Sequence, residues 1–345
     1  MTAALLYVVI GLATVVVLLN GAIIATRAAL IQRQKRLRRV RPGTETLLAE
    51  YLAGTPAMPA TATRRERAVL LDVALEAIAD LRGEERARLV GLLEELGFVS
   101  SAMSGLSARR RVSRRRAAEV LATIRSRAAV GALTPALADR DALVAVTCAY
   151  TLAEMGGEGY VAAVIATIKR HAVRAPGATA AAMLALGAKQ PSALTPLLAR
   201  DVAPPVRMTA IEIVSELRLP QYLPALRACL TDAGGTDSDD VAASAARGLG
   251  LIGDAEAVEA LIGFTSDASR TGAARAAAAQ ALGSIGDPRA VPVLATQLRA
   301  RDWKVRAAAT GALGGLGDPG IAVLRRAASS GSAEVRLLAE AALQP

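Results

Sequence analysis

The sequence predicts an all-α protein in which an N-terminal transmembrane helix precedes an α-solenoid of about seven to eight helical hairpins. Three observations lead to this fold class. Hydrophobic residues make up 53% of the chain but aromatic residues only 2%, a composition typical of closely packed helices. Residues 3–25 carry no charged side chain, and one motif recurs from residue 113 to the end.

The charge-free segment predicts a membrane anchor. As a helix that rises about 1.5 Å per residue, it would cross the roughly 30 Å hydrocarbon layer of a bilayer once. A cleaved signal peptide and a buried core helix are the alternatives, but a signal peptide begins with basic residues, whereas the first one here is Arg27. The positive-inside rule then predicts a single-pass protein of the bacterial inner cell membrane, with the N-terminus outside and the solenoid in the cytoplasm.

The net charge of +10 is concentrated in two places. The basic segment behind the anchor contributes candidate contacts to anionic lipid headgroups, or else serves only as a topology signal; the candidates are Arg33, Lys35, Arg36, Arg38, Arg39 and Arg41. In the second group, the guanidinium groups are close enough to repel one another unless an acidic partner is near. This group is a candidate partner-binding site, or else a solvated face. It comprises Arg109, Arg110, Arg111, Arg114, Arg115 and Arg116. A nucleic-acid-binding solenoid spreads its positive charge along a continuous face, so we expect no nucleic-acid partner.

Composition and repetition together predict four segments. Prolines and small residues before residue 64 indicate an extended spacer, and an unrelated pair of amphipathic helices follows it. The expected segments are a transmembrane helix over 1–26, a basic segment and linker over 27–63, an N-terminal helical cap over 64–112 and repeats over 113–345.

The repeats are defined by a motif of about fifteen residues that occurs every 30 to 35 residues. Its clearest copies read VRAAATGALGGLGDP from Val305 and ARAAAAQALGSIGDP from Ala274. Copies of varying strength start at residues 113, 144, 176, 206, 241, 274, 305 and 335. One unit is predicted to be a helix, a tight turn and a second helix of about ten residues.

Residues at the ends of the predicted helices support this hairpin. In several copies, the residue three positions before the start has a side chain that can cap a helix N-terminus. These residues are Asp141, Ser238, Thr271, Asp302 and Ser332. Glycines that can end the first helix in a left-handed conformation are Gly156, Gly253, Gly286 and Gly317. The predicted caps of the second helix are Asp254, Asp287 and Asp318.

The motif resembles the HEAT-repeat family, and within it the short repeats named after phycobilisome lyases. The resemblance covers residues 113–345 and rests on the ALGxxGDP pattern of the copies at Ala274 and Val305. It implies an α-solenoid, but the class contains bilin lyase subunits, enzyme partners and scaffolds, so it implies no single function. Membrane-anchored bacterial proteins of this build include companions of glycosyltransferases.

We expect no catalytic, cofactor-binding or metal-binding residues. The single histidine, His171, lies at a predicted helix end, where a cation would be favoured, and Cys148 and Cys229 lie far apart in apolar stretches as buried thiols. The acidic insertion around Asp239 lacks the glycine and glutamate of a calcium loop. Arginines recur at the second motif position, and we expect them either to line a binding surface or to pair with acidic residues. They are Arg207, Arg275, Arg306 and Arg336.

These features predict a membrane-tethered, non-enzymatic scaffold that binds a protein at the cytoplasmic face, such as a membrane glycosyltransferase. One alternative is a lyase-like or chaperone-like subunit that acts on a cofactor-bearing protein. Another is nucleic-acid binding through the arginines between Arg109 and Arg116. Homo-oligomerisation is an open alternative that nothing in the sequence supports.

Overall fold

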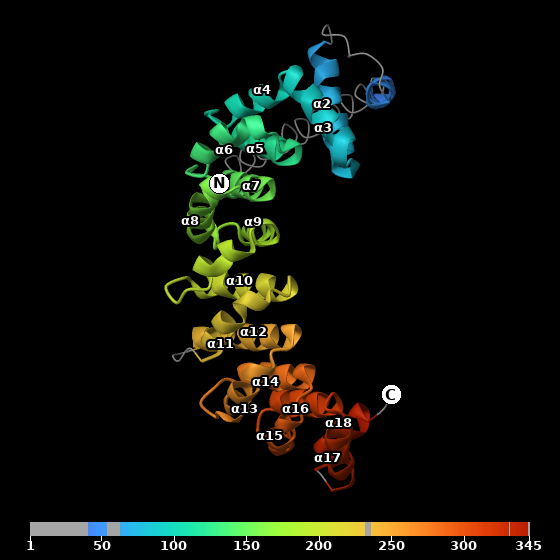
Figure 1. Ribbon diagram of the computed structural model, residues 1–345, viewed down its shortest axis with the longest axis vertical. Coiled ribbons are helices and arrows are strands. Elements are labelled where there is room, and N and C mark those ends of the chain that lie inside the picture. Colours follow the sequence, from blue (N-terminus) through green and yellow to red (C-terminus); the bar gives the residue numbers. More distant parts are fainter. Residues whose placement is uncertain (1–40, 54–62, 232–235, 331, 344–345) are drawn as a thin grey trace, which may run out of the picture. The chain divides into compact units, whose positions relative to one another are not determined.

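A computed structural model describes residues 41–53, 63–231, 236–330 and 332–343, and every regular element in these ranges is a helix (Figure 1). The chain divides into two compact units, of which one ends at Gly105 and the other starts at Leu106. The all-helical character predicted from composition agrees with the structure.

The transmembrane part of the predicted fold class needs correction. In the ranges that the structure describes, no helix is both long and apolar enough to cross a membrane. The longest ones, α2 (Arg64–Asp80) and α12 (Thr236–Ile252), have 17 residues each and include charged residues, whereas a span needs about 20 mostly apolar residues. The predicted anchor over 1–26 lies outside the described residues. The inner-membrane location and the membrane-associated partner, which both rested on that anchor, are therefore not retained.

The N-terminal unit contains a helix over residues 41–52, followed by α2, α3 (Gly83–Glu95) and α4 (Phe98–Gly105). Thr63 fixes the start of α2, because its hydroxyl accepts a hydrogen bond from the Glu66 amide at 3.3 Å while the Thr63 amide donates to the Glu66 carboxylate at 2.7 Å. This reciprocal cap satisfies two amides that a helix start otherwise leaves unpaired. Most of the predicted linker, residues 54–62, lies outside the described residues.

The second unit is a row of stacked helical hairpins, with first helices on one side and second helices on the other (Figure 1). Every predicted repeat start falls within a first helix. The first helices, called A helices below, are α5 (Arg111–Ile124), α7 (Ala142–Met155), α9 (Pro176–Lys189), α10 (Pro204–Glu216), α12, α14 (Gly272–Ile285), α16 (Trp303–Gly314) and α18 (Ala333–Ala342).

The second helices, called B helices below, are short, and most of them follow a 3₁₀ turn. They are α6 (Val130–Ala136), α8 (Val161–His171), α11 (Leu223–Thr231), α13 (Val258–Ser266), α15 (Val291–Gln297) and α17 (Gly317–Ser330). In the third hairpin a 3₁₀ segment, η3 (Pro191–Leu197), takes the place of the predicted second helix. Pro196 inside it has no amide to donate, and its ring would clash with the preceding helical turn.

Most predicted helix caps are confirmed. Asp141, Thr271, Asp302 and Ser332 each accept a hydrogen bond from an amide in the first turn of an A helix. Gly286 ends α14 in the left-handed conformation, at φ 79°. Asp254 and Asp287 cap the 3₁₀ turns that open the fifth and sixth B segments.

Three predicted caps are wrong. Gly317 does not end α16, which stops at Gly314, but is the first residue of α17. Ser238 lies inside α12, because this helix begins at Thr236 and is therefore longer at its N-terminus than predicted. Asp318 lies in the first turn of α17, which begins at Gly317 and so includes the residue that was expected to precede it. At Ser238 and Asp318 the helix starts earlier than the predicted cap.

Small residues set the spacing between neighbouring A helices. A Cβ added at Gly283 of α14 would lie 2.6 Å from the Cα of Ala312 in α16, and one added at Gly250 of α12 would lie 2.8 Å from the Cα of Ala281 in α14. Counted from the repeat start, both glycines hold position ten and both alanines position eight. The ALG part of the motif therefore encodes a contact between successive repeats.

The junction of α10 and α12 has the same contact between positions ten and eight, but here the smaller residue is at position eight and the larger one at position ten. Ser215 holds position ten on α10, and Gly248 holds position eight on α12. A Cβ added at Gly248 would collide with the Ser215 hydroxyl. The larger residue has moved to the other helix, so close packing is retained.

Candidate functional site

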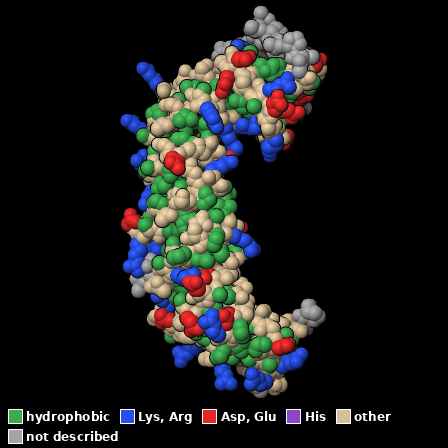
Figure 2. All heavy atoms as spheres, in the orientation of Figure 1, with side chains coloured by type: hydrophobic (Ala, Val, Ile, Leu, Met, Phe, Trp, Pro, Cys, Tyr) green, Lys and Arg blue, Asp and Glu red, His purple; other side chains and the backbone are tan. Residues whose placement is uncertain are grey.

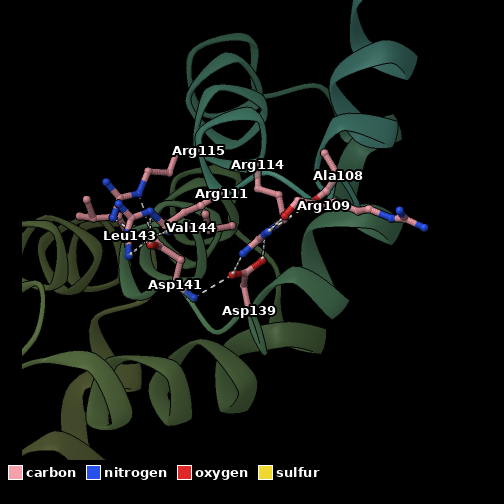
Figure 3. A network of polar contacts seen from close by, with 9 residues as sticks. All are labelled: Ala108, Arg109, Arg111, Arg114, Arg115, Asp139, Asp141, Leu143 and Val144. Carbon is pink, nitrogen blue, oxygen red and sulfur yellow. Dashed lines mark hydrogen bonds and ion pairs between the residues drawn. The ribbon is translucent and has the colours of Figure 1, made fainter.

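The predicted arginine site lies at the start of the second unit, and two of its members bind acidic residues of the chain itself (Figure 3). The Arg114 guanidinium contacts the Asp139 carboxylate with Nε at 2.7 Å and Nη2 at 3.1 Å. Arg115 forms the same bidentate contact with the Asp141 carboxylate, with Nε at 2.9 Å and Nη2 at 2.8 Å. Both acids lie between α6 and α7, so the two arginines join the first hairpin to the second.

Asp141 binds Arg115 and also caps a helix. Its carboxylate also accepts hydrogen bonds from the amides of Leu143 and Val144 at 3.1 and 3.3 Å, and so caps α7. The hydrogen bond from Arg115 is the main cause that holds the pKa of Asp141 below its usual value. The carboxylate therefore stays ionised and serves the helix start and the arginine together.

The other predicted arginines lie on the surface. Arg109, Arg110 and Arg116 are exposed, and the exposed Arg111 lies 3.7 Å from Asp141. Val112 is 74% exposed because it lies in the first turn of α5, ahead of the buried stripe that starts at Ala117.

Arg114 has a structural equivalent in α16. Arg114 donates from Nη1 to the carbonyls of Ala108 and Arg109, and Arg306 donates in the same way to two carbonyls before its own helix, at 2.7 and 2.8 Å. Both hold position two of the motif, a signal that could have separated Arg114 from its neighbours before the structure was known.

Arg207 and Arg275, the other position-two arginines that are not exposed, also form hydrogen bonds with groups of the protein itself. Arg275 donates to the carbonyl of Thr265 at 2.9 Å and to the Gln297 side chain at 2.6 Å. The buried Arg207 contacts the Cys229 thiol at 3.3 Å. Arg306 also binds the Glu334 carboxylate. The repeated arginines that are not exposed are therefore structural, and two of the four, Arg114 and Arg306, pair with an acid as predicted.

The predicted lipid-contact residues lie outside the described residues, except for Arg41. Its guanidinium contacts the Glu45 carboxylate at 2.6 Å and also binds Glu76 of α2. Arg41 thus contacts acidic side chains of its own unit.

His171 is buried at the end of α8, and neither ring nitrogen has a hydrogen-bond partner among the described residues. Burial, followed by the charges of Arg170 and Arg174, lowers its pKa. The lowered pKa opposes the positive charge that a helix C-terminus favours. Within the described ranges, no three metal-ligating side chains come together.

The B-helix side carries ion pairs between successive repeats. Arg227 of α11 contacts Asp254 at 2.6 Å, and Arg289 contacts Glu259 of α13 at 3.2 Å. Figure 2 shows positive and negative side chains intermingled over α11 to α14. Charges on this side are largely matched within the protein.

The A-helix side carries a groove instead. A cavity of about 340 Å³ lies across α10, α12 and α14, and one of about 660 Å³ lies across α12, α14 and α16. Their walls share Arg247, Gln280 and Ser284, so the two form one continuous surface. We call it the A-face groove and define it by Glu212, Glu216, Arg247, Leu251, Gln280, Ser284, Trp303 and Lys304.

The A-face groove has a floor of small residues and an aromatic wall. Alanines and glycines of α14 and α16 line the larger cavity, because the close approach of these helices requires small side chains there. Trp303, the single tryptophan of the chain, is 63% exposed in this wall, and Leu251 is 42% exposed in the smaller cavity. The sequence did not reveal this site, since its walls come from four repeats and only Trp303 departs visibly from the motif.

Two repeat families match the sequence. The family described as HEAT repeats matches residues 235–302 and 269–344, and the PBS lyase HEAT-like repeat matches residues 113–139. These ranges contain the first hairpin and the hairpins from α12 onward. The chain therefore contains HEAT repeats in these ranges. A search of curated proteins gives no match.

In fold, this HEAT-repeat protein is similar to crystal structures of Kap121p. Kap121p bound to RanGTP aligns with a TM-score of 0.54 at 13% identity, over 87% of this chain and 40% of that chain. The karyopherin Kap121p bound to the SUMO protease Ulp1p gives 0.53 at 13% identity, over 87% and 41%. The HEAT-repeat protein spans about two fifths of the Kap121p chains, and at this identity the likeness concerns the fold alone.

Proposed function

We propose that this HEAT-repeat protein is a scaffold that binds another protein in the A-face groove. The observation that carries the proposal is a continuous groove across four A helices, with a largely exposed tryptophan in its wall. Exposed aromatic and arginine side chains at the rim of an apolar depression are typical of residues that dominate protein interfaces. The Kap121p structures offer support by analogy, since several contain a bound protein.

Position-specific crosslinking tests this proposal. A photo-reactive amino acid replaces Gln280 in the full chain, and the matched control carries it at Thr296, which is exposed on α15. We expect a protein to be crosslinked from position 280, to be lost in the Trp303→Ala background and to be absent at position 296. Equal products at both positions, or none at 280, would contradict the proposal.

The exposed arginines Arg109, Arg110 and Arg111 stay a second proposed contact region, for an acidic protein partner. Nucleic-acid binding is less well supported, because Arg114 and Arg115 are each held by a carboxylate. The alternative of a lyase-like or chaperone-like subunit also requires a bound protein, so the identity of the protein crosslinked from position 280 distinguishes it from a scaffold.

A further inference from the structure

We infer that the A-face groove selects a polypeptide segment with unlike ends, one basic and one acidic, and with an apolar side chain beside Trp303. The inference rests on the proposed function and adds the chemistry of the partner. It follows from the unequal distribution of charge along the groove.

The half of the groove over α12, α14 and α16 is basic. The larger cavity is lined by Arg247 and Lys304 and by no acidic residue. Arg247 donates to the Ser244 hydroxyl at 2.9 Å and lies between the two halves, because it also lines the smaller cavity. Lys304 lies in the first turn of α16 with its side chain exposed, and the positive end of this helix is capped by Asp302, which accepts a hydrogen bond from the Lys304 amide at 2.8 Å. This half therefore attracts carboxylates.

The half over α10 is acidic. Glu212 and Glu216 line the smaller cavity one helical turn apart, both exposed, and neither forms an ion pair with any described residue. Like charges at this spacing destabilise a helix slightly. A lysine or arginine of a bound segment placed between them would remove that repulsion.

The apolar contact lies in the basic half. Trp303 stands beside a floor of small side chains that includes Ala276 and Ala307. An aliphatic or aromatic side chain can cover this floor and stack on the indole, which supplies contact energy that the charges alone would lack. The segment should therefore carry its apolar residue next to its acidic end.

The same distribution disfavours a nucleic acid. A single strand would gain from stacking on Trp303 and from the two cations. Its phosphates repeat at every nucleotide, however, so a strand that follows the groove toward α10 would place them against Glu212 and Glu216. A polypeptide can change the sign of its charge along its length.

A random peptide display library, selected on the full chain with counter-selection on Trp303→Ala, tests the inference. We expect enriched peptides to carry basic residues toward one end, acidic residues toward the other and an apolar residue beside the acids. Synthetic copies should shift the fluorescence of Trp303. The Glu212→Lys, Glu216→Lys double variant should weaken their binding by about tenfold, and a library selected on it should lose the basic end.

Enriched peptides without this charge pattern, or unchanged selection by the double variant, would overturn the inference. Equal or tighter binding of an oligothymidylate, measured by the same fluorescence, would replace it with a nucleic-acid partner. Thermal melts of each variant verify folding, since all three substituted side chains are exposed. If crosslinking from position 280 succeeds while the peptides lack the pattern, the scaffold stands and only the charge preference fails.

Discussion

The first junction of the second unit and the junctions under the A-face groove differ in how their A helices meet, while the last junction resembles the first because Arg306 of α16 binds Glu334 at the start of α18. Between α5 and α7, arginines of one hairpin reach carboxylates at the start of the next. Between α12, α14 and α16, backbones approach closely through glycine and alanine. One repeat period thus supports two kinds of contact between neighbouring hairpins, and the A-face groove lies over the small-residue kind.

The largest expected effect is at the small-residue junction. Gly283→Ala would bring a Cβ against the backbone of α16, which cannot move without disturbing the next repeat, so we expect a loss of about 1–3 kcal/mol in unfolding free energy. Chemical denaturation of the full chain measures it. Hydrogen exchange should show the loss concentrated in α14 and α16.

The matched control is Gly263→Ala in α13. An added Cβ there meets no atom within 4 Å, so the substitution should leave stability unchanged or raise it by up to about 1 kcal/mol through helix propensity. Equal destabilisation by both substitutions would mean that the close approach of the A helices is not what Gly283 provides.

A somewhat smaller effect is expected at the charged junction. Arg114→Ala removes a partly buried pair, whose side chains are 18% and 11% exposed, and the hydrogen bonds to two carbonyls. We expect a loss of about 2 kcal/mol, the range for hydrogen bonds to charged groups. Denaturation midpoints of the two proteins at equal ionic strength provide the measurement.

Arg109→Ala is the control within the same cluster. Its side chain is exposed, so the change in stability should stay within about 0.5 kcal/mol. A loss as large as that of Arg114→Ala would indicate that the whole cluster, rather than one motif position, joins the two hairpins.

The smallest expected effect is a pH dependence from His171, which lies on α8 between these two regions. Burial keeps the pKa of the folded ring below its ordinary value of 6.5, and Asp141, which raises it, is outweighed. Between the two pKa values the unfolded chain binds more protons, so stability falls as pH is lowered from neutral through that range.

Thermal melts across this range, compared with His171→Leu, isolate the contribution. The variant should be less sensitive to pH there. The lowered pKa of Asp141 acts only in more acidic solution, below the ordinary value of 3.8. A variant with the same pH dependence as the parent would mean that the ring is not the group that titrates.

The repeats could be predicted from the sequence because their caps and glycines act locally. Asp141, Thr271 and Gly286 determine helix ends through their own side chain or φ angle, so a single chain segment contains the necessary information. The predicted cap at Ser238 was wrong because the acidic insertion lengthens α12 at its start. The 3₁₀ segment could not be predicted from its interior Pro196 alone, because Pro135 holds the same place in α6, which remains an α-helix.

The groove could not be predicted in the same way. Glu212 and Lys304 become walls of one surface only after four repeats are stacked with a defined spacing, and one motif copy contains no information about that distance. The ion pairs of Arg114 and Arg115 could not be predicted for a related reason, since Asp139 and Asp141 lie in the connection to the next hairpin.

The proline-containing segment η3 has a consequence for how the stack unfolds. In a linear array each hairpin is stabilised by its neighbours, and cooperativity passes along the row through these contacts. A 3₁₀ segment has poorer hydrogen-bond geometry than an α-helix, so the third hairpin is where this transmission should be weakest. We expect partial unfolding to divide the array there, so that the hairpins that carry the groove remain folded as one block while those before it open.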